Sequence, residues 1–102
     1  MSLFVIPWYA ARDFTTEVPL NRRVFVIRMR FNHLAGHYVL DFFSRSMTPL
    51  LLGVAAVQGA DFLEFMPREF HPGGHMFLEG QEPTYENLLS GAAVLVYDDA
   101  SL

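Results

Sequence analysis

The sequence predicts a mainly β fold: a small antiparallel domain, barrel-like or a sandwich, with one or two short helical turns. Two neighbouring segments, residues 22–32 and 37–43, alternate their side chains with the period of two that is typical of strands. A turn that contains Gly36 separates them, and glycine readily takes the positive φ of tight turns. Apolar residues make up 52% of the chain, which indicates a folded domain.

The N-terminal part of the chain predicts two strands. Residues 3–9 form either a strand or an extended arm bent at Pro7, and residues 14–18 form a strand that ends before Pro19. The first segment has two interpretations: an edge strand within the domain, or a strand added to a neighbouring subunit. We therefore expect one domain over residues 1–102, with residues 1–10 as a potential extended arm.

The central hairpin, residues 22–43, carries the strongest strand signal, and each of its strands has two different faces. The predicted core face consists of Phe25, Ile27, Met29 and Phe31 on one strand and of Tyr38, Leu40 and Phe42 on the other. The opposite face is apolar at one end and charged at the other. Because the register cannot be derived from sequence, either Arg28 or Arg30 is expected to meet Asp41 across the strands.

The remaining segments predict further strands, to a total of six or seven, and short helical turns. Residues 50–57 form a strand that Gly53 interrupts with a bulge. Asp61 is a candidate cap for a short helix within 60–66, with Phe62 and Phe65 on one side. The other expected elements are a loop at 67–74, a strand at 75–78, a helical turn at 84–89 that begins at Thr84, and a last strand at 92–97.

Composition narrows the classes of function. The chain has no Cys and no Lys, so disulfides, thiolate chemistry and a phosphate-binding P-loop are excluded. Its net charge of −4 makes it a poor binder of nucleic-acid phosphates, so no nucleic-acid partner is expected. No apolar run is long enough to span a membrane, and no signal-peptide pattern precedes the domain, so we expect a soluble intracellular protein without a membrane partner.

Four histidines form the only spacing that suggests a metal site. His33 and His37 lie four residues apart, as do His71 and His75. Zinc ligands at this spacing normally sit on a helix, whereas both pairs here flank predicted turns or loops. Carboxylates are scattered, and no serine lies in a nucleophile motif. We therefore expect no metal site, no cofactor, no catalytic residues and no enzymatic activity.

Four stretches in the middle of the chain follow one another in this order: "RMRFNHLAGHYVLDFF", "TPLLLGVAAVQGADFLEF", "PTYENL" and "VLVYDD". Together they resemble a known family, the small baseplate plug proteins of contractile-tailed phages, and the resemblance covers residues 22–98. Four places depart from the family pattern: His37-Tyr38, the turn from Ser44 to Met47, Leu89-Ser90, and the His- and Pro-rich loop from Arg68 to Gly74. The matching positions are Arg28, Arg30, Phe31, Asn32, Leu40, Asp41, Phe42, Pro49, Leu50, Leu51, Gly59, Asp61, Phe62, Leu63, Pro83, Thr84, Asn87 and Leu88.

The resemblance implies a structural part of the virion tail baseplate, assembled in the host cytoplasm. It implies contacts with hub, tail tube and wedge proteins, and several copies in a homo-oligomeric ring. The second apolar face of the hairpin would then be covered by other chains, since obligate interfaces resemble a core cut in half. The expected interface residues are Phe4, Ile6, Trp8, Val24, Val26, Arg28, Arg30, Asp41 and Phe43.

Two alternatives from other classes remain open. One is a small β-barrel that binds or converts a ligand in a Phe-rich interior, with His71 or His75 at its mouth. The other is a regulatory module that binds a metal through the histidines. A soluble monomer that binds a small ligand would favour the first alternative, whereas co-purification with tail proteins favours the baseplate interpretation.

Overall fold

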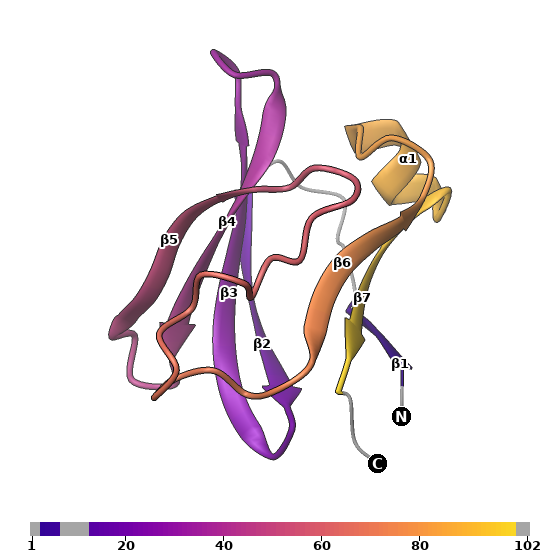
Figure 1. Ribbon diagram of the computed structural model, residues 1–102. Helices are drawn as coiled ribbons and strands as arrows, with labels where there is room; N and C mark the ends of the chain where they lie inside the picture. Colours follow the sequence, from indigo (N-terminus) through magenta and orange to yellow (C-terminus); the bar gives the residue numbers. More distant parts are fainter. Residues whose placement is uncertain (1–2, 7–12, 100–102) are drawn as a thin grey trace.

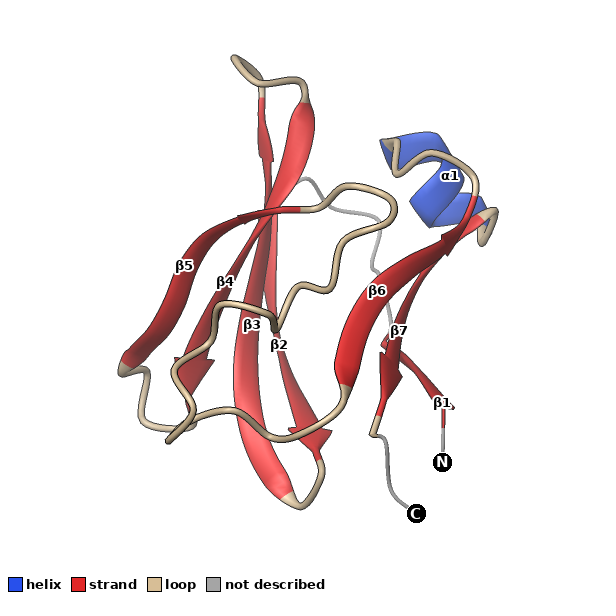
Figure 2. Ribbon diagram, viewed as in Figure 1, coloured by secondary structure: helices blue, strands red, loops and turns tan. Residues whose placement is uncertain are grey.

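Two antiparallel sheets form the protein, as a computed structural model that describes residues 3–6 and 13–99 shows (Figures 1 and 2). One sheet has three strands in the order β1-β7-β6, and the other has four in the order β2-β3-β4-β5. A single short helix, α1, is present among the described residues. The elements are β1 (Leu3–Ile6), β2 (Asp13–Leu20), β3 (Arg23–Asn32), β4 (His37–Ser44), β5 (Pro49–Ala55), β6 (His75–Gly80), α1 (Tyr85–Ser90) and β7 (Ala93–Asp98).

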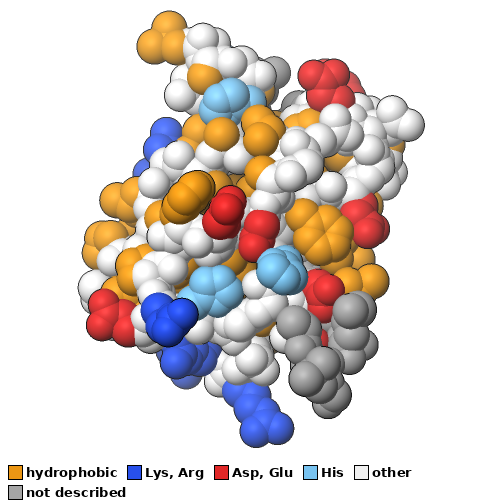
Figure 3. Space-filling model, viewed as in Figure 1, with side chains coloured by type: hydrophobic (Ala, Val, Ile, Leu, Met, Phe, Trp, Pro, Cys, Tyr) orange, Lys and Arg blue, Asp and Glu red, His pale blue; other side chains and the backbone are white. Residues whose placement is uncertain are grey.

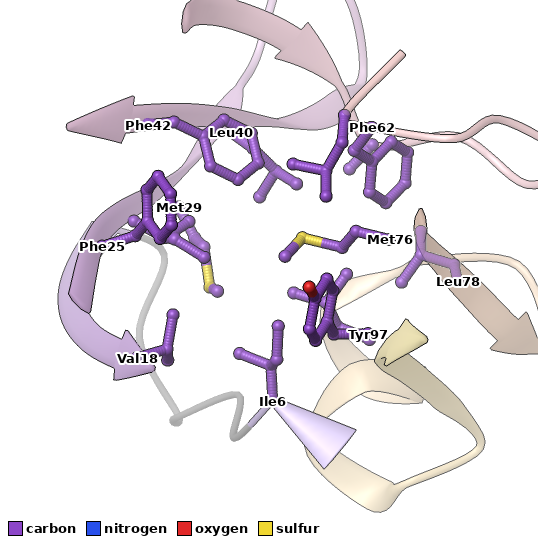
Figure 4. Close-up of a cluster of buried hydrophobic side chains, with 14 of the residues drawn as sticks. Ile6, Val18, Phe25, Met29, Leu40, Phe42, Phe62, Met76, Leu78 and Tyr97 are labelled. Carbon is purple, nitrogen blue, oxygen red and sulfur yellow. The ribbon is translucent and has the colours of Figure 1, made fainter. Parts of the chain in front are cut away.

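The core lies between the two sheets. The side chains predicted for the core face of the hairpin are buried, except Phe31, which is half-buried and packs against the core. They meet Ile6 of β1, Met76 of β6 and Tyr97 of β7 from the opposite sheet (Figure 4). The two sheets make a sandwich and not a closed barrel, so the antiparallel β prediction is confirmed in its sandwich form.

The long connection from residue 56 to residue 74 closes one side of the sandwich, between β5 and β6 (Figures 1 and 2). It contributes Ala56, Phe62, Leu63 and Met66 to the core. Asp61 anchors it, because its Oδ1 accepts hydrogen bonds from the backbone N–H of Leu63 and of Met76, each at 3.1 Å. The short helix predicted within 60–66 is wrong: Asp61 opens a series of turns, and Phe65 points outward while Phe62 is buried.

Two local predictions are confirmed by the backbone. Thr84 caps helix α1, since its hydroxyl accepts a hydrogen bond from the N–H of Asn87 at 3.1 Å. The bulge predicted at Gly53 is present, because the register of β4 and β5 shifts between Leu40 and Phe42, and Gly53 has a φ of 76°. The strand itself ends at Ala55, two residues earlier than predicted.

Candidate protein interface

The outer face of the four-stranded sheet, opposite the core, is the candidate interface. Paired residues across the strands form rows on this face. One row is apolar apart from Glu17 and runs from Glu17 through Val26 and Phe43 to Pro49. The next rows are charged, where Arg28 lies opposite Asp41, and Arg30 lies opposite both Asp13 and Val39. The face is therefore apolar at one end and charged toward the other, as the sequence indicated.

Six of the nine predicted interface residues lie on this outer face, all on β3 and β4: Val24, Val26, Arg28, Arg30, Asp41 and Phe43. Val26 and Phe43 face each other directly. Val26 is buried but does not belong to the core cluster, so its burial comes from the outer side of the sheet. Val24, Arg30 and Phe43 are half-buried, and Arg28 is exposed.

Two ion pairs cross this face diagonally. The guanidinium of Arg28 donates two hydrogen bonds to Asp13, from Nε to Oδ1 at 3.1 Å and from Nη2 to Oδ2 at 2.7 Å. Arg30 donates from Nε to Oδ2 of Asp41 at 3.0 Å. Hydrogen bonding to Arg28 lowers the pKa of Asp13 and raises that of Arg28. Of the two partners predicted for Asp41, Arg30 forms the contact, although Arg28 stands directly opposite.

Asp41 ties three strands together. Its side chain is 6% exposed, and its second oxygen, Oδ1, accepts a hydrogen bond from the N–H of Gly53 at 2.8 Å. One carboxylate thus holds Arg30 on β3 and the bulge on β5. The ion pair of Asp13 and the hydrogen bond from Gly53 to Asp41 were not predicted from sequence. The alternation of Asp13, Thr15 and Glu17 along one face of β2 was the available signal for Asp13.

We expect Asp41→Ala to destabilise the chain by about 2–3 kcal/mol, because it leaves a charged donor and a backbone donor without their acceptor. The free energy of unfolding, measured by urea denaturation, checks this. Asp13→Ala is the control, because it removes an exposed carboxylate, and exposed ion pairs contribute little to stability. Equal losses in the two variants would contradict the anchoring role of Asp41.

The three predicted interface residues near the N-terminus have different positions. Phe4 lies on β1, is 51% exposed and stacks on Tyr97 with ring centroids 6.3 Å apart. Ile6, also predicted for the interface, is 4% exposed and packs in the core of the isolated chain, because it faces inward opposite Leu95. Trp8 lies outside the described residues. Strand β1 pairs with β7 of the same chain, as in the first of its two sequence interpretations.

The four histidines lie in separate environments. His33 is exposed in the β3–β4 turn and meets Phe31 edge-on, and Nδ1 of His37 lies 3.0 Å from the carbonyl of Tyr38. Nδ1 of His71 accepts a hydrogen bond from the N–H of Gly73. His75 pairs with Asp61, with 2.8 Å between Nδ1 and Oδ2. No group of three or more potential metal ligands occurs among the described residues.

The pair of His75 and Asp61 makes stability depend on pH. The hydrogen bond to Asp61 raises the pKa of His75 above 6.5. Partial burial opposes ionisation of Asp61, but hydrogen bonds from His75, Met76 and Leu63 outweigh it and lower its pKa below 3.8. The contribution of His75 to the free energy of unfolding is complete below pH 6.5 and is lost as pH rises through its raised pKa. The contribution of Asp61 to the same free energy is complete above pH 3.8 and is lost as pH falls through its lowered pKa.

We therefore expect His75→Gln to lose the most stability between about pH 4 and 6.5, and progressively less at alkaline pH. The loss should not exceed about 1 kcal/mol, because solvent screens this exposed pair. Urea denaturation of both proteins across this pH range measures the difference. A difference that grows as the solution becomes alkaline would contradict the assignment.

The interior offers no support for the ligand-binding alternative, because side chains of both sheets fill the space between them (Figure 4). Two cavities at the surface have volumes of about 690 Å³ and 570 Å³. His75 borders a smaller one, of about 350 Å³, beside Phe77 and Leu78.

On the side shown in Figure 3, arginine side chains gather at the lower left, and most carboxylates lie at the centre and right.

The fold and this outer face define a small β-sandwich with a candidate surface for binding other proteins. The chain belongs to a family of phage baseplate plugs: a family model described as "Cyanophage baseplate Pam3 plug gp18" matches residues 3–100. The family resemblance seen in residues 22–98 is thereby confirmed, and the match extends it almost to both ends of the sequence. A search of curated proteins gives no match. Within the described residues, no helix is long and apolar enough to cross a membrane.

Proposed function

We propose that this baseplate plug protein joins the central hub, the tail tube and the wedge proteins of a contractile phage tail through protein–protein contacts. It acts without catalysis, in several copies that form a ring, as a part of the virion that assembles in the host cytoplasm. The observation that carries the proposal is the family match over residues 3–100. The outer face of the four-stranded sheet supports it, because it combines apolar and charged groups in one continuous surface.

The chemistry of this face suits a specific contact between proteins. Val24 and Phe43, both half-buried, supply apolar area at one end, and burying such area against a partner is the main source of affinity. The adjacent ion pairs of Arg28 and Arg30 supply charged groups whose positions are fixed by hydrogen bonds to Asp13 and Asp41. Charged groups of this kind set the register and reject wrong partners more than they add affinity.

Co-purification tests the proposal. Tagged chain is co-expressed with the hub, tail tube and wedge proteins of the same phage, and the complex is isolated through the tag. Phe43→Glu should abolish recovery of at least one of these proteins, because it places a charge in the apolar row. Leu89→Glu is the matched control: Leu89 lies on α1, is 51% exposed, and should tolerate the change. Full recovery with Phe43→Glu would reject this face as the interface.

Light scattering on the chain alone tests the ring. A ring predicts a discrete multiple of the chain mass that Phe43→Glu converts to monomer. Substitutions are preferable to a deletion of the N-terminal residues, because Ile6 belongs to the core. A monomer at every concentration would contradict a ring formed by this chain alone and would leave the co-purification test to decide the joining role.

A further inference from the structure

The two sheets have four edge strands, β1 and β6 in one sheet and β2 and β5 in the other. An edge strand presents unpaired N–H and C=O groups to any extended chain that approaches it. Proteins therefore protect their edges with charges, prolines, bulges or a covering segment. Comparison of the four edges shows which of them is open to a partner.

Three of the four edges carry such protection. Strand β2 contains Pro19, which lacks an N–H, and the charged Glu17. Strand β5 begins at Pro49 and contains the bulge at Gly53. Strand β6 is covered by the 56–74 connection: the backbone N–H of Met76 donates to Asp61, and its carbonyl accepts from the N–H of Phe62 at 2.7 Å.

Within the part of the chain that the structure describes, strand β1 has none of these protections. Its sequence, Leu-Phe-Val-Ile, contains no charge and no proline, and its register with β7 is continuous, without a bulge. Its first three side chains are largely exposed: Leu3 by 59%, Phe4 by 51% and Val5 by 67%. Within the described residues, its only neighbour in the sheet is β7. An unprotected apolar edge of this kind is a hazard for a protein that works alone.

The free edge of β1 opens into a groove that β2 closes on the other side. The groove has a volume of about 690 Å³ and runs along residues 4–6 of β1 and 16–22 of β2 and the following turn. Its apolar lining includes Phe4, Val18 and Leu20, and charged side chains of Glu17 and Arg22 border it. The opposite side of the sandwich is closed by residues 56–74, so the two sides of the fold differ.

We propose that β1 accepts an extended segment of another baseplate protein, which adds a fourth strand to the three-stranded sheet along this groove. Main-chain hydrogen bonds to β1 would hold the segment, and its alternate apolar side chains would point into the groove. The open backbone edge favours a strand, since a strand can pair with it at about 4.8 Å, whereas a helix uses its backbone groups in its own hydrogen bonds. Only the identity of the donor as a baseplate protein rests on the proposed function.

A generic probe tests the edge itself. The probe is a blocked hexapeptide of alternating valine and threonine, titrated into the ¹⁵N-labelled full chain up to millimolar concentration and followed by NMR. We expect the largest amide shifts at Leu3–Ile6, slower hydrogen exchange at alternate residues of β1, and no shifts on the outer face of the four-stranded sheet. Unchanged amides along β1 at saturating peptide would overturn the proposal.

Matched variants separate edge pairing from a general attraction to apolar surface. Val5→Lys should weaken binding of the peptide by about tenfold or more, equivalent to at least ~1.4 kcal/mol, because a lysine on an edge strand opposes pairing. Leu52→Lys, at a 55% exposed position on the edge strand β5, should leave binding unchanged. Equal weakening by both variants would overturn edge pairing. Leu3→Lys replaces Val5→Lys if the NMR spectrum of the latter shows loss of the fold.

Two further outcomes distinguish this proposal from self-association of the chain and from the proposed joining function. Shifts at β1 that grow with chain concentration, without peptide, would show that a second copy occupies the edge and would overturn the choice of a separate partner segment. Peptide binding together with failed co-purification would keep the edge site and reject the proposed joining function. The two proposals therefore fail in different experiments.

Discussion

Gly74→Ala is expected to destabilise the protein by about 3–5 kcal/mol. Gly74 has a φ of +80°, and a Cβ at this position would collide with the carbonyl oxygen of Asp98 and with the backbone of Asp99. The substitution therefore combines a left-handed conformation that alanine disfavours with an overlap that only a backbone shift can relieve. For a chain of this size the melting temperature should fall by more than about 10 °C.

Gly36→Ala is the control for this prediction. Gly36 has a similar φ of +76°, but nothing lies within 4 Å of the position that a Cβ would occupy. The control carries the conformational cost alone, about 1 kcal/mol. Thermal unfolding followed by circular dichroism compares the two variants with the parent protein. Similar losses in both would mean that the chain around Asp98 and Asp99 moves aside without cost.

Phe42→Ala should also destabilise the chain by about 3–5 kcal/mol, because Phe42 is fully buried between the sheets and its removal leaves a cavity. Its neighbour Phe43 points to the outer face and is half-buried. Phe43→Ala should therefore cost less stability in the isolated chain and more in the recovery of partner proteins. Urea denaturation and co-purification of both variants measure the two effects.

The two phenylalanines thus separate folding from binding at adjacent positions. If Phe43→Ala destabilised the isolated chain as much as Phe42→Ala, the outer face would be part of the fold's own core and not a surface for partners. If neither variant affected recovery of partners at a temperature where both are folded, the interface would have to lie elsewhere.

Local patterns were sufficient to predict much of this fold. The faces of the central hairpin followed from period-two alternation, since a strand places Met29 and Leu40 on the opposite side from Arg30 and Asp41. The cap at Thr84 and the bulge at Gly53 followed from residue chemistry at single positions. Each of these features depends on residues that are close in sequence, where few arrangements are sterically allowed.

Features that depend on distant residues could not be predicted. The pairing of Leu3 with Asp98 joins opposite ends of the described chain, and no local pattern specifies it. For that reason the inward position of Ile6 was missed. Asp61 was predicted as a helix cap because aspartate is common at that position. Its side chain does accept from the nearby N–H of Leu63, but its second partner, the N–H of Met76, belongs to a distant strand. Asp41 pairs with Arg30, which lies diagonally across the strands, and not with Arg28, which lies directly opposite. This preference likewise depends on side-chain geometry in the folded sheet.

The position of β7 has a consequence for the order in which the protein forms during synthesis. It is the last of the described strands along the chain and also the central strand of its sheet, between β1 and β6. Strand β1 therefore cannot pair until β7 has left the ribosome, whereas β2 to β5 can pair in succession as hairpins. A chain that stops before residue 93 lacks the central strand of the three-stranded sheet, so this sheet cannot form. The edge of β1 is therefore available to a partner only after β7 has been synthesised.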